Sequence, residues 1–198
     1  MVDPNFVYLA GAITFIGIAL YAIDTIKGKT KPNRVTWILW TIVPLITFFA
    51  QLGKDVGISS IFTLSYALGP LLVVIASFSN KNAYWKLDYF DYLCGSIAIL
   101  AIALWLITGN GILAIVFSVA ADFTAGLPTL RKAFIEPTSE SFIAYLLGVL
   151  SAIITLLTVQ AWNTETVLFP VYILLNSALI CLTIKVFYKF SRNNQNRG

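Results

Sequence analysis

The chain has 198 residues, of which 59% are hydrophobic and only 11% are charged, and its formal net charge is +4. A soluble domain carries about 25% charged residues, so this composition excludes an ordinary water-soluble domain and makes the lipid bilayer the first expected partner. The sequence contains no histidine, which removes the commonest general base and metal ligand. We therefore expect no enzyme, no metal site, no cofactor and no nucleic-acid partner.

Seven apolar runs follow one another along the chain, and each is long enough to cross a bilayer, which takes roughly 20 residues. They cover Phe6–Ile26, Val35–Leu52, Ile58–Phe78, Tyr89–Ile107, Ile112–Leu130, Phe142–Gln160 and Val167–Phe187. None shows the alternation of a membrane strand, so the pattern predicts seven membrane helices and an all-α, polytopic fold. The Asn/Arg-rich segment after Ser191 is predicted to be a disordered tail.

Basic residues indicate the orientation of these helices. Twelve of the 13 lie on one predicted side, in the loops after the first, third and fifth runs and in the tail, and only Lys54 lies on the other side. The positive-inside rule then places the N-terminus outside and the C-terminus in the cytoplasm. We expect a multi-pass protein of the cell (inner) membrane.

Two loops look like copies of one another. With Pro32 set against Pro137, KPNRVTWILW aligns with EPTSESFIAY, and Thr25 falls opposite Thr129 after a one-residue gap. The alignment predicts two parallel three-helix bundles, residues 1–80 and 111–190, joined by a linker helix in 81–110 and followed by a tail in 191–198. A chance likeness of two loops rich in proline and aromatic residues is the alternative.

Six of the seven runs carry small and polar residues at steps of three or four, which places them on one helix face. These faces hold Thr14, Gly17, Tyr21 and Asp24; Thr36, Trp40, Pro44, Thr47 and Gln51; Ser59, Thr63, Tyr66 and Pro70; Ser118, Asp122, Ala125 and Thr129; Ala144, Gly148, Ser151, Thr155 and Thr158; and Tyr172, Asn176 and Thr183. The fourth run has no such face, so we expect it against lipid and the other six around a polar interior. Such faces can also serve only to pack helices closely.

Asp122 is the strongest candidate functional residue. It lies about ten residues into the fifth run, near the middle of the membrane at ~1.5 Å per residue. A charge there costs roughly 2.5–3.5 kcal/mol, so the carboxylate must face a cavity, find a partner or carry a proton. The functional interpretation is a proton or cargo site, and the structural one is a neutral Asp bonded to a neighbouring helix.

The remaining candidates have two interpretations each. Asn176 and Tyr172 can contact a polar cargo or join helices, and Asp24 can act in transport or pair with a loop lysine. Pro44 and Pro128 can act as hinges or as simple packing bends. The five tryptophans lie close to the predicted membrane borders, and we interpret most of them as interface anchors.

The segment LPTLRK at 127–132, followed by EPTSES at 136–141, resembles the PQ-loop signature of a proline–glutamine pair, a basic loop and a Lys-Ser-Thr-like helix entry. With three, one and three helices, the chain resembles the SWEET/PQ-loop superfamily, which includes sugar uniporters, amino-acid exporters, vitamin-precursor transporters and the KDEL receptors. The resemblance implies that Asn176 is similar to an Asn lining the sugar site, and Asp122 to an Asp of proton-coupled members. Thr129 stands where the signature has Gln.

We therefore expect a transporter that moves a small polar solute, such as a sugar, an amino acid or a vitamin precursor, by alternating access, with proton linkage through Asp122. The expected pathway contains Asp122, Asn176, Thr129, Ser118, Tyr172, Trp40, Gln51 and Asp24. The alternative is a receptor or assembly partner that transports nothing on the same fold. The expected partners are the bilayer and the solute, and homo-oligomers are an open alternative.

Overall fold

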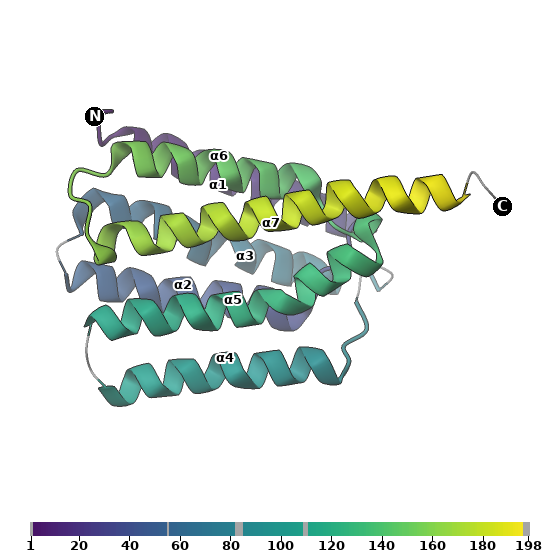
Figure 1. The fold of residues 1–198 in the computed structure, drawn as a ribbon, viewed down its shortest axis with the longest axis horizontal. Coiled ribbons are helices and arrows are strands. Elements are labelled where there is room, and N and C mark those ends of the chain that lie inside the picture. The colour runs from purple at the N-terminus through teal and green to yellow at the C-terminus, as the bar shows by residue number, and fades with distance from the viewer. Residues whose placement is uncertain (1, 55, 82–84, 109–110, 196–198) are drawn as a thin grey trace.

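A computed structural model describes residues 2–54, 56–81, 85–108 and 111–195, and every regular element in these ranges is a helix (Figure 1). The α-helices are α1 (Phe6–Ile26), α2 (Arg34–Leu52), α3 (Ser60–Ser79), α4 (Tyr89–Thr108), α5 (Gly111–Ile135), α6 (Phe142–Thr158) and α7 (Thr164–Gln195). Two short 3-10 helices, η1 (Gly57–Ser59) and η2 (Pro137–Ser139), precede α3 and α6. The expected all-α class is confirmed.

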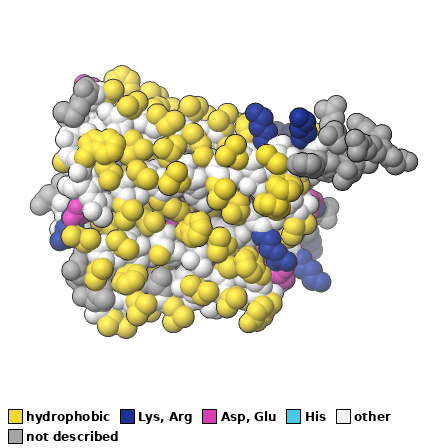
Figure 2. Space-filling view, in the orientation of Figure 1, with side chains coloured by type: hydrophobic (Ala, Val, Ile, Leu, Met, Phe, Trp, Pro, Cys, Tyr) yellow, Lys and Arg dark blue, Asp and Glu magenta, His cyan; other side chains and the backbone are white. Residues whose placement is uncertain are grey.

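Four helical segments are long and apolar enough to cross a membrane: Phe6–Ile26, Arg34–Leu52, Gly57–Ser79 and Thr164–Lys189. Two shorter apolar helical stretches, Tyr89–Leu104 and Phe142–Thr158, belong to α4 and α6. Hydrophobic side chains cover most of the face in Figure 2, and Lys and Arg side chains gather at the end where the C-terminus lies. These are the features of a multi-pass membrane protein.

Helix ends are where the sequence prediction was wrong. The helix of α5 continues past Leu130 to Ile135, and α7 continues past Phe187 to Gln195, into the segment predicted as a disordered tail. Hydropathy marks where a chain leaves the lipid, whereas Lys, Arg and Gln are good helix formers that let the backbone ladder continue in water. The α6 helix, in contrast, ends at Thr158, two residues before the predicted end.

The helices form two similar sets of neighbours. Within one set α3 contacts both α1 and α2, and within the other α7 contacts both α5 and α6. The sets meet where α1 packs on α6 and α2 packs on α5, while α4 packs mainly on α5. Figure 1 shows α4 at the edge of this arrangement and the two termini at opposite ends of the molecule.

Close approach of α1 to α6 depends on Gly17. A Cβ atom at this position would lie 3.0 Å from Leu147 Cβ and 3.2 Å from the carbonyl oxygen of Ala144. The second neighbour is backbone and cannot turn aside. Glycine therefore allows the two helices to contact each other through the main chain, as small residues do in membrane bundles.

Gly17→Ala is expected to lower the stability of the protein in detergent by about 1–3 kcal/mol, because the added methyl overpacks the α1–α6 contact. The matched control is Gly11→Ala in the same helix, where the nearest atoms to a new Cβ lie at 3.8 Å. That change should leave stability equal or higher, because Ala favours helix by up to about 1 kcal/mol. Thermal unfolding of the two purified variants measures the difference, and equal melting temperatures would contradict the role assigned to Gly17.

Candidate functional site

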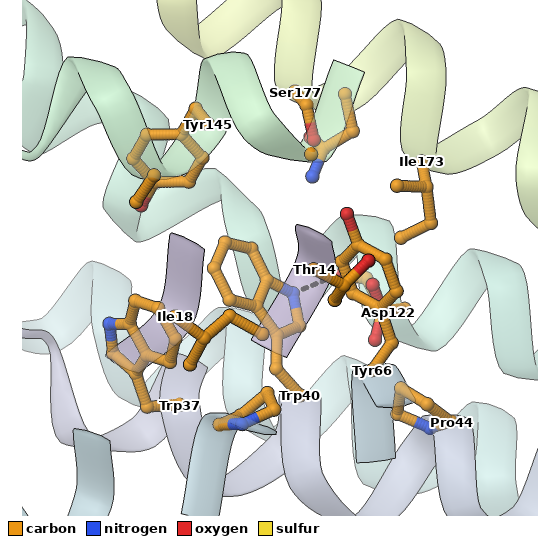
Figure 3. Close-up of a pocket in the computed structure, with 14 residues that line it drawn as sticks. Thr14, Ile18, Trp37, Trp40, Pro44, Tyr66, Asp122, Tyr145, Ile173 and Ser177 are labelled. Atoms are coloured by element: carbon orange, nitrogen blue, oxygen red, sulfur yellow. Dashed lines mark hydrogen bonds between the residues drawn. The ribbon is translucent and has the colours of Figure 1, made fainter. Parts of the chain in front are cut away.

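A cavity of about 50 Å³ lies in the interior of the helix bundle (Figure 3). Side chains from α1, α2, α3, α5, α6 and α7 line it, and the lining contains no described residue of α4. These are the six helices that carry polar faces in the sequence. At roughly 10–15 Å³ for each water, the space would hold about three to five waters, so it is a small cavity whose mainly apolar wall carries a few polar groups.

Asp122 of α5 reaches this cavity, and its side chain is only 2% exposed. One carboxylate oxygen, Oδ2, accepts a hydrogen bond of 2.6 Å from the Tyr172 hydroxyl of α7. The other oxygen, Oδ1, has no hydrogen-bond partner among the described residues. None of the described residues that line the cavity is a Lys or an Arg. The carboxylate thus has one neutral donor and no countercharge.

Trp40 of α2 fixes the main chain of α5 beside this carboxylate. Its indole Nε1 donates to the carbonyl oxygen of Asp122 at 3.1 Å, drawn as the dashed line in Figure 3. One turn further on, the Thr36 hydroxyl donates to the carbonyl oxygen of Ala125 at 2.7 Å. A Cβ at Gly126 would lie 3.1 Å from the Trp40 ring, so glycine allows the close approach of the indole to α5. The position of Asp122 therefore depends on the contact between α2 and α5.

Aromatic rings form much of the cavity wall. Trp37, Trp40, Tyr66 and Tyr145 all line it, and the rings of Trp37 and Trp40 meet edge to face with centroids 5.3 Å apart. Trp37 is 3% and Trp40 9% exposed. Trp40 was expected in the pathway, whereas the interpretation as an interface anchor does not hold for Trp37, because the direction of a ring depends on helix rotation, which hydropathy does not report.

Of the residues singled out in the sequence, Asp122, Asn176, Trp40 and Pro44 line the cavity, and Tyr172 contacts it through its bond to Asp122. The others are absent from the lining. Ser118 and Thr129 are buried in the bundle, and Pro128 lies in α5. Gln51 is also buried and donates to the carbonyl oxygen of Glu165, which joins α2 to the start of α7.

Asp24 lies at the end of α1, where its carboxylate is 3.6 Å from Lys29 Nζ. Asp24 therefore pairs with a loop lysine, which is the structural alternative given above, and it does not line the cavity. Sequence reasoning did not select Thr14, Tyr66, Gly148 or Ser177 as site residues, although all four line the cavity. The first three lie on the polar faces of their helices, so selecting every residue of these faces would have included them.

A second set of contacts joins the loops before α2 and before α6. We call it the loop clasp, and its members are Lys31, Lys132, Glu136, Ser139 and Glu140. The backbone N–H of Lys31 donates to the carbonyl oxygen of Ser139 at 3.0 Å, and its Nζ lies 2.6 Å from Glu136 Oε1. These loops are the two segments that align in the sequence, so the proposed copies touch one another.

The centre of the loop clasp is a buried ion pair. Lys132 Nζ lies 2.6 Å from Glu140 Oε1, both side chains are fully buried, and Lys132 also donates to the carbonyl oxygen of Lys31. The second oxygen of Glu140 accepts a hydrogen bond of 3.0 Å from the Tyr145 hydroxyl. Because Tyr145 also lines the cavity, one side chain connects the clasp to the candidate site.

The start of α4 is held by further polar contacts at the same end. Arg131 donates to Asp88 at 2.5 Å, and this guanidinium hydrogen bond lowers the pKa of the exposed Asp88 carboxyl. Asp91 is buried and accepts from the Asn33 side chain at 2.8 Å. This bond ties the N-cap residue of α2 to the first turn of α4.

Lys132→Ala is expected to destabilise the protein by about 3–5 kcal/mol, because it leaves the Glu140 charge buried and unpaired. The matched control is Lys31→Ala, whose partner Glu136 is about one-third exposed and should cost only about 0–1 kcal/mol. Unfolding in a denaturing detergent measures both. The double change Lys132→Met with Glu140→Leu should recover most of the loss, and a double variant as unstable as Lys132→Ala would contradict the assignment of the cost to an unpaired charge.

Comparison of the chain with protein-family models, with curated proteins and with solved structures gives no match. The function of the cavity is therefore inferred from its own residues, because a fold alone hosts many functions.

Proposed function

We propose that this chain is a membrane transporter that moves a small polar solute by alternating access, with the cavity at Asp122 as the solute site. The observation that carries the proposal is a buried carboxylate with a free oxygen, on a side chain that lines a cavity between six helices. Ionisable groups inside a membrane are costly and default to a functional role. A carboxylate needed only to join two helices would be expected to have both oxygens paired.

The proposed architecture is a duplicated one, with seven membrane helices in two parallel three-helix bundles and α4 as the linker. Two observations support it. The α3 helix contacts both α1 and α2 as α7 contacts both α5 and α6, and the two loops that align in sequence contact each other. The proposed units are residues 1–80 and 111–190. This is the plan of the SWEET/PQ-loop superfamily, to which the segment 127–141 is similar, and we propose that the chain is a divergent relative.

The proposed orientation places the loop clasp in the cytoplasm and the N-terminus outside, in the inner membrane of a cell. Lys31, Arg131 and Lys132 belong to the clasp or lie next to it, and the positive-inside rule favours the cytoplasmic side for such residues. The clasp then closes the cytoplasmic end of the cavity. Opening toward the cytoplasm requires the loops before α2 and α6 to separate, which breaks the clasp.

The size of the cavity supports a closed state of the transporter. Ligand pockets usually enclose about 300–1,000 Å³, whereas this cavity has about 50 Å³. A solute larger than a few waters can enter only when helices move apart. Such a movement must break the loop clasp at the proposed cytoplasmic end of the cavity. The buried ion pair of the clasp stabilises the closed state.

An uptake screen in proteoliposomes tests the proposal, with labelled sugars, amino acids, nucleosides and vitamin precursors. At least one solute should accumulate inside. Asp122→Asn should reduce its uptake by about tenfold or more, since hydrogen bonds to a charged group contribute about 1.5–3 kcal/mol. Asp3→Asn, which removes an exposed carboxylate near the N-terminus, is the matched control and should leave uptake unchanged.

The transporter proposal fails if no solute moves or if Asp122→Asn transports as well as the unmodified chain. Binding of a solute without any uptake would instead favour the receptor that transports nothing. Equilibrium binding to the same preparation, measured beside uptake, distinguishes these two results.

A further inference from the structure

The cavity has an unbalanced charge. Among the described residues that line it, Asp122 is the one acid, and no basic side chain accompanies it. Tyr172 donates to Oδ2 alone, and the Trp40 indole donates to the backbone carbonyl of Asp122 and not to its carboxylate. Oδ1 is thus a buried acceptor without a donor among the described residues, on a side chain that lines the cavity. A group that donates a hydrogen bond and carries a positive charge would complete the site.

The aromatic side chains in the walls of the cavity also suit a positively charged group. Four aromatic side chains line it, namely Trp37, Trp40, Tyr66 and Tyr145. In Figure 3 the side chains of Trp40 and Tyr66 lie next to Asp122. Aromatic faces attract cations through their negative quadrupole, and the attraction is strongest where water is excluded. A carboxylate beside aromatic faces is therefore a site for an organic cation.

We propose that the solute is a small organic cation, an amine, guanidinium or quaternary ammonium compound, held by the Asp122 carboxylate and the aromatic walls. This inference rests on the proposed transport function and names the class of its solute. A neutral sugar would leave an ionised Asp122 without a counterion in a low-dielectric interior, which is costly. An anion would be repelled by the same carboxylate.

The charge of Asp122 must be neutralised both when the cavity holds a cation and when it does not. When the cavity holds no cation, a proton on Asp122 removes the buried charge. When the cation enters, the proton leaves to the water on the side to which the cavity is open. The titratable groups that face Asp122 are the neutral tyrosines Tyr66 of α3, Tyr145 of α6 and Tyr172 of α7, while the lining residues of α1 and α2 do not titrate. One carboxylate therefore binds either the proton or the cation, and the transporter exchanges them.

The first test is equilibrium binding to the full chain in lipid nanodiscs, using pairs of probes that differ in charge but not in shape. The pairs are guanidinium with urea, and choline with 3,3-dimethylbutan-1-ol. In at least one pair the cation should bind about tenfold or more tightly than its neutral partner, the ratio expected for a desolvated cation on an aromatic face. Binding should weaken as the pH is lowered, because protons compete for Asp122.

Variants locate the binding. Asp122→Asn should abolish the preference for the cation, whereas Asp122→Glu should retain it, and Asp3→Asn should behave as the unmodified chain does. The comparison of charged and neutral probes needs no variant, so it remains decisive even if Asp122→Asn fails to fold. The proposal is overturned if neither cation binds, if the neutral partners bind equally well, or if a folded Asp122→Asn keeps the preference.

Uptake separates this inference from the transport proposal. In proteoliposomes an acidic interior should drive accumulation of the cation, with no dependence on membrane potential, because each cation replaces one proton. Transport of a neutral sugar through the cavity without cation binding would overturn the cation site and leave transport standing. Cation binding without uptake would leave the site standing and overturn transport.

Discussion

The contact between α2 and α5 is the interaction on which the candidate site depends. In lipid no water is available to satisfy polar groups, so each must find its partner inside the protein. Trp40 and Thr36 of α2 donate to two carbonyl oxygens of α5, one turn apart, namely those of Asp122 and Ala125. Gly126 permits the close approach of the indole to α5. These bonds fix the helix and leave the carboxylate itself with a single donor.

Loop clasp and cavity are parts of one connected network. Glu140 binds Lys132 through one oxygen and the Tyr145 hydroxyl through the other, and the Tyr145 ring forms part of the cavity wall. The Tyr145 ring meets that of Tyr21 edge to face, and the Tyr21 ring packs at a tilt against Trp37 with centroids 4.5 Å apart. On the proposed transport function, a solute that moves Tyr145 would act directly on Glu140, the acceptor of the buried ion pair. Such a contact would differ between closed and open forms, as a two-state exchange requires.

The sequence predicted the helices well, and the rotation of some helices and the long-range contacts poorly. Asp122 was identified as a candidate site residue because burying a carboxylate in an apolar helix costs free energy whichever way the side chain points. Trp37 was misread because depth alone does not say whether a ring faces lipid or the interior. Lys132 was counted only as a loop charge, because its burial depends on Glu140 and on the Lys31 carbonyl about a hundred residues away. Local sequence patterns do not predict such contacts, because the residues involved meet only when the helices pack.

On the proposed duplication, the two halves have divided the chemistry of the site. With Thr25 set against Thr129, the position equivalent to Asp122 is Ile18, and both side chains line the cavity. The other alignment, Pro32 on Pro137, pairs Trp40 with Tyr145, and these two rings also line it. The aromatic wall is therefore shared by both halves, whereas the carboxylate belongs to one. A single carboxylate can bind one cation or one proton at a time, so, on the proposed duplication and function, divergence at this one position would supply the charge on which exchange depends.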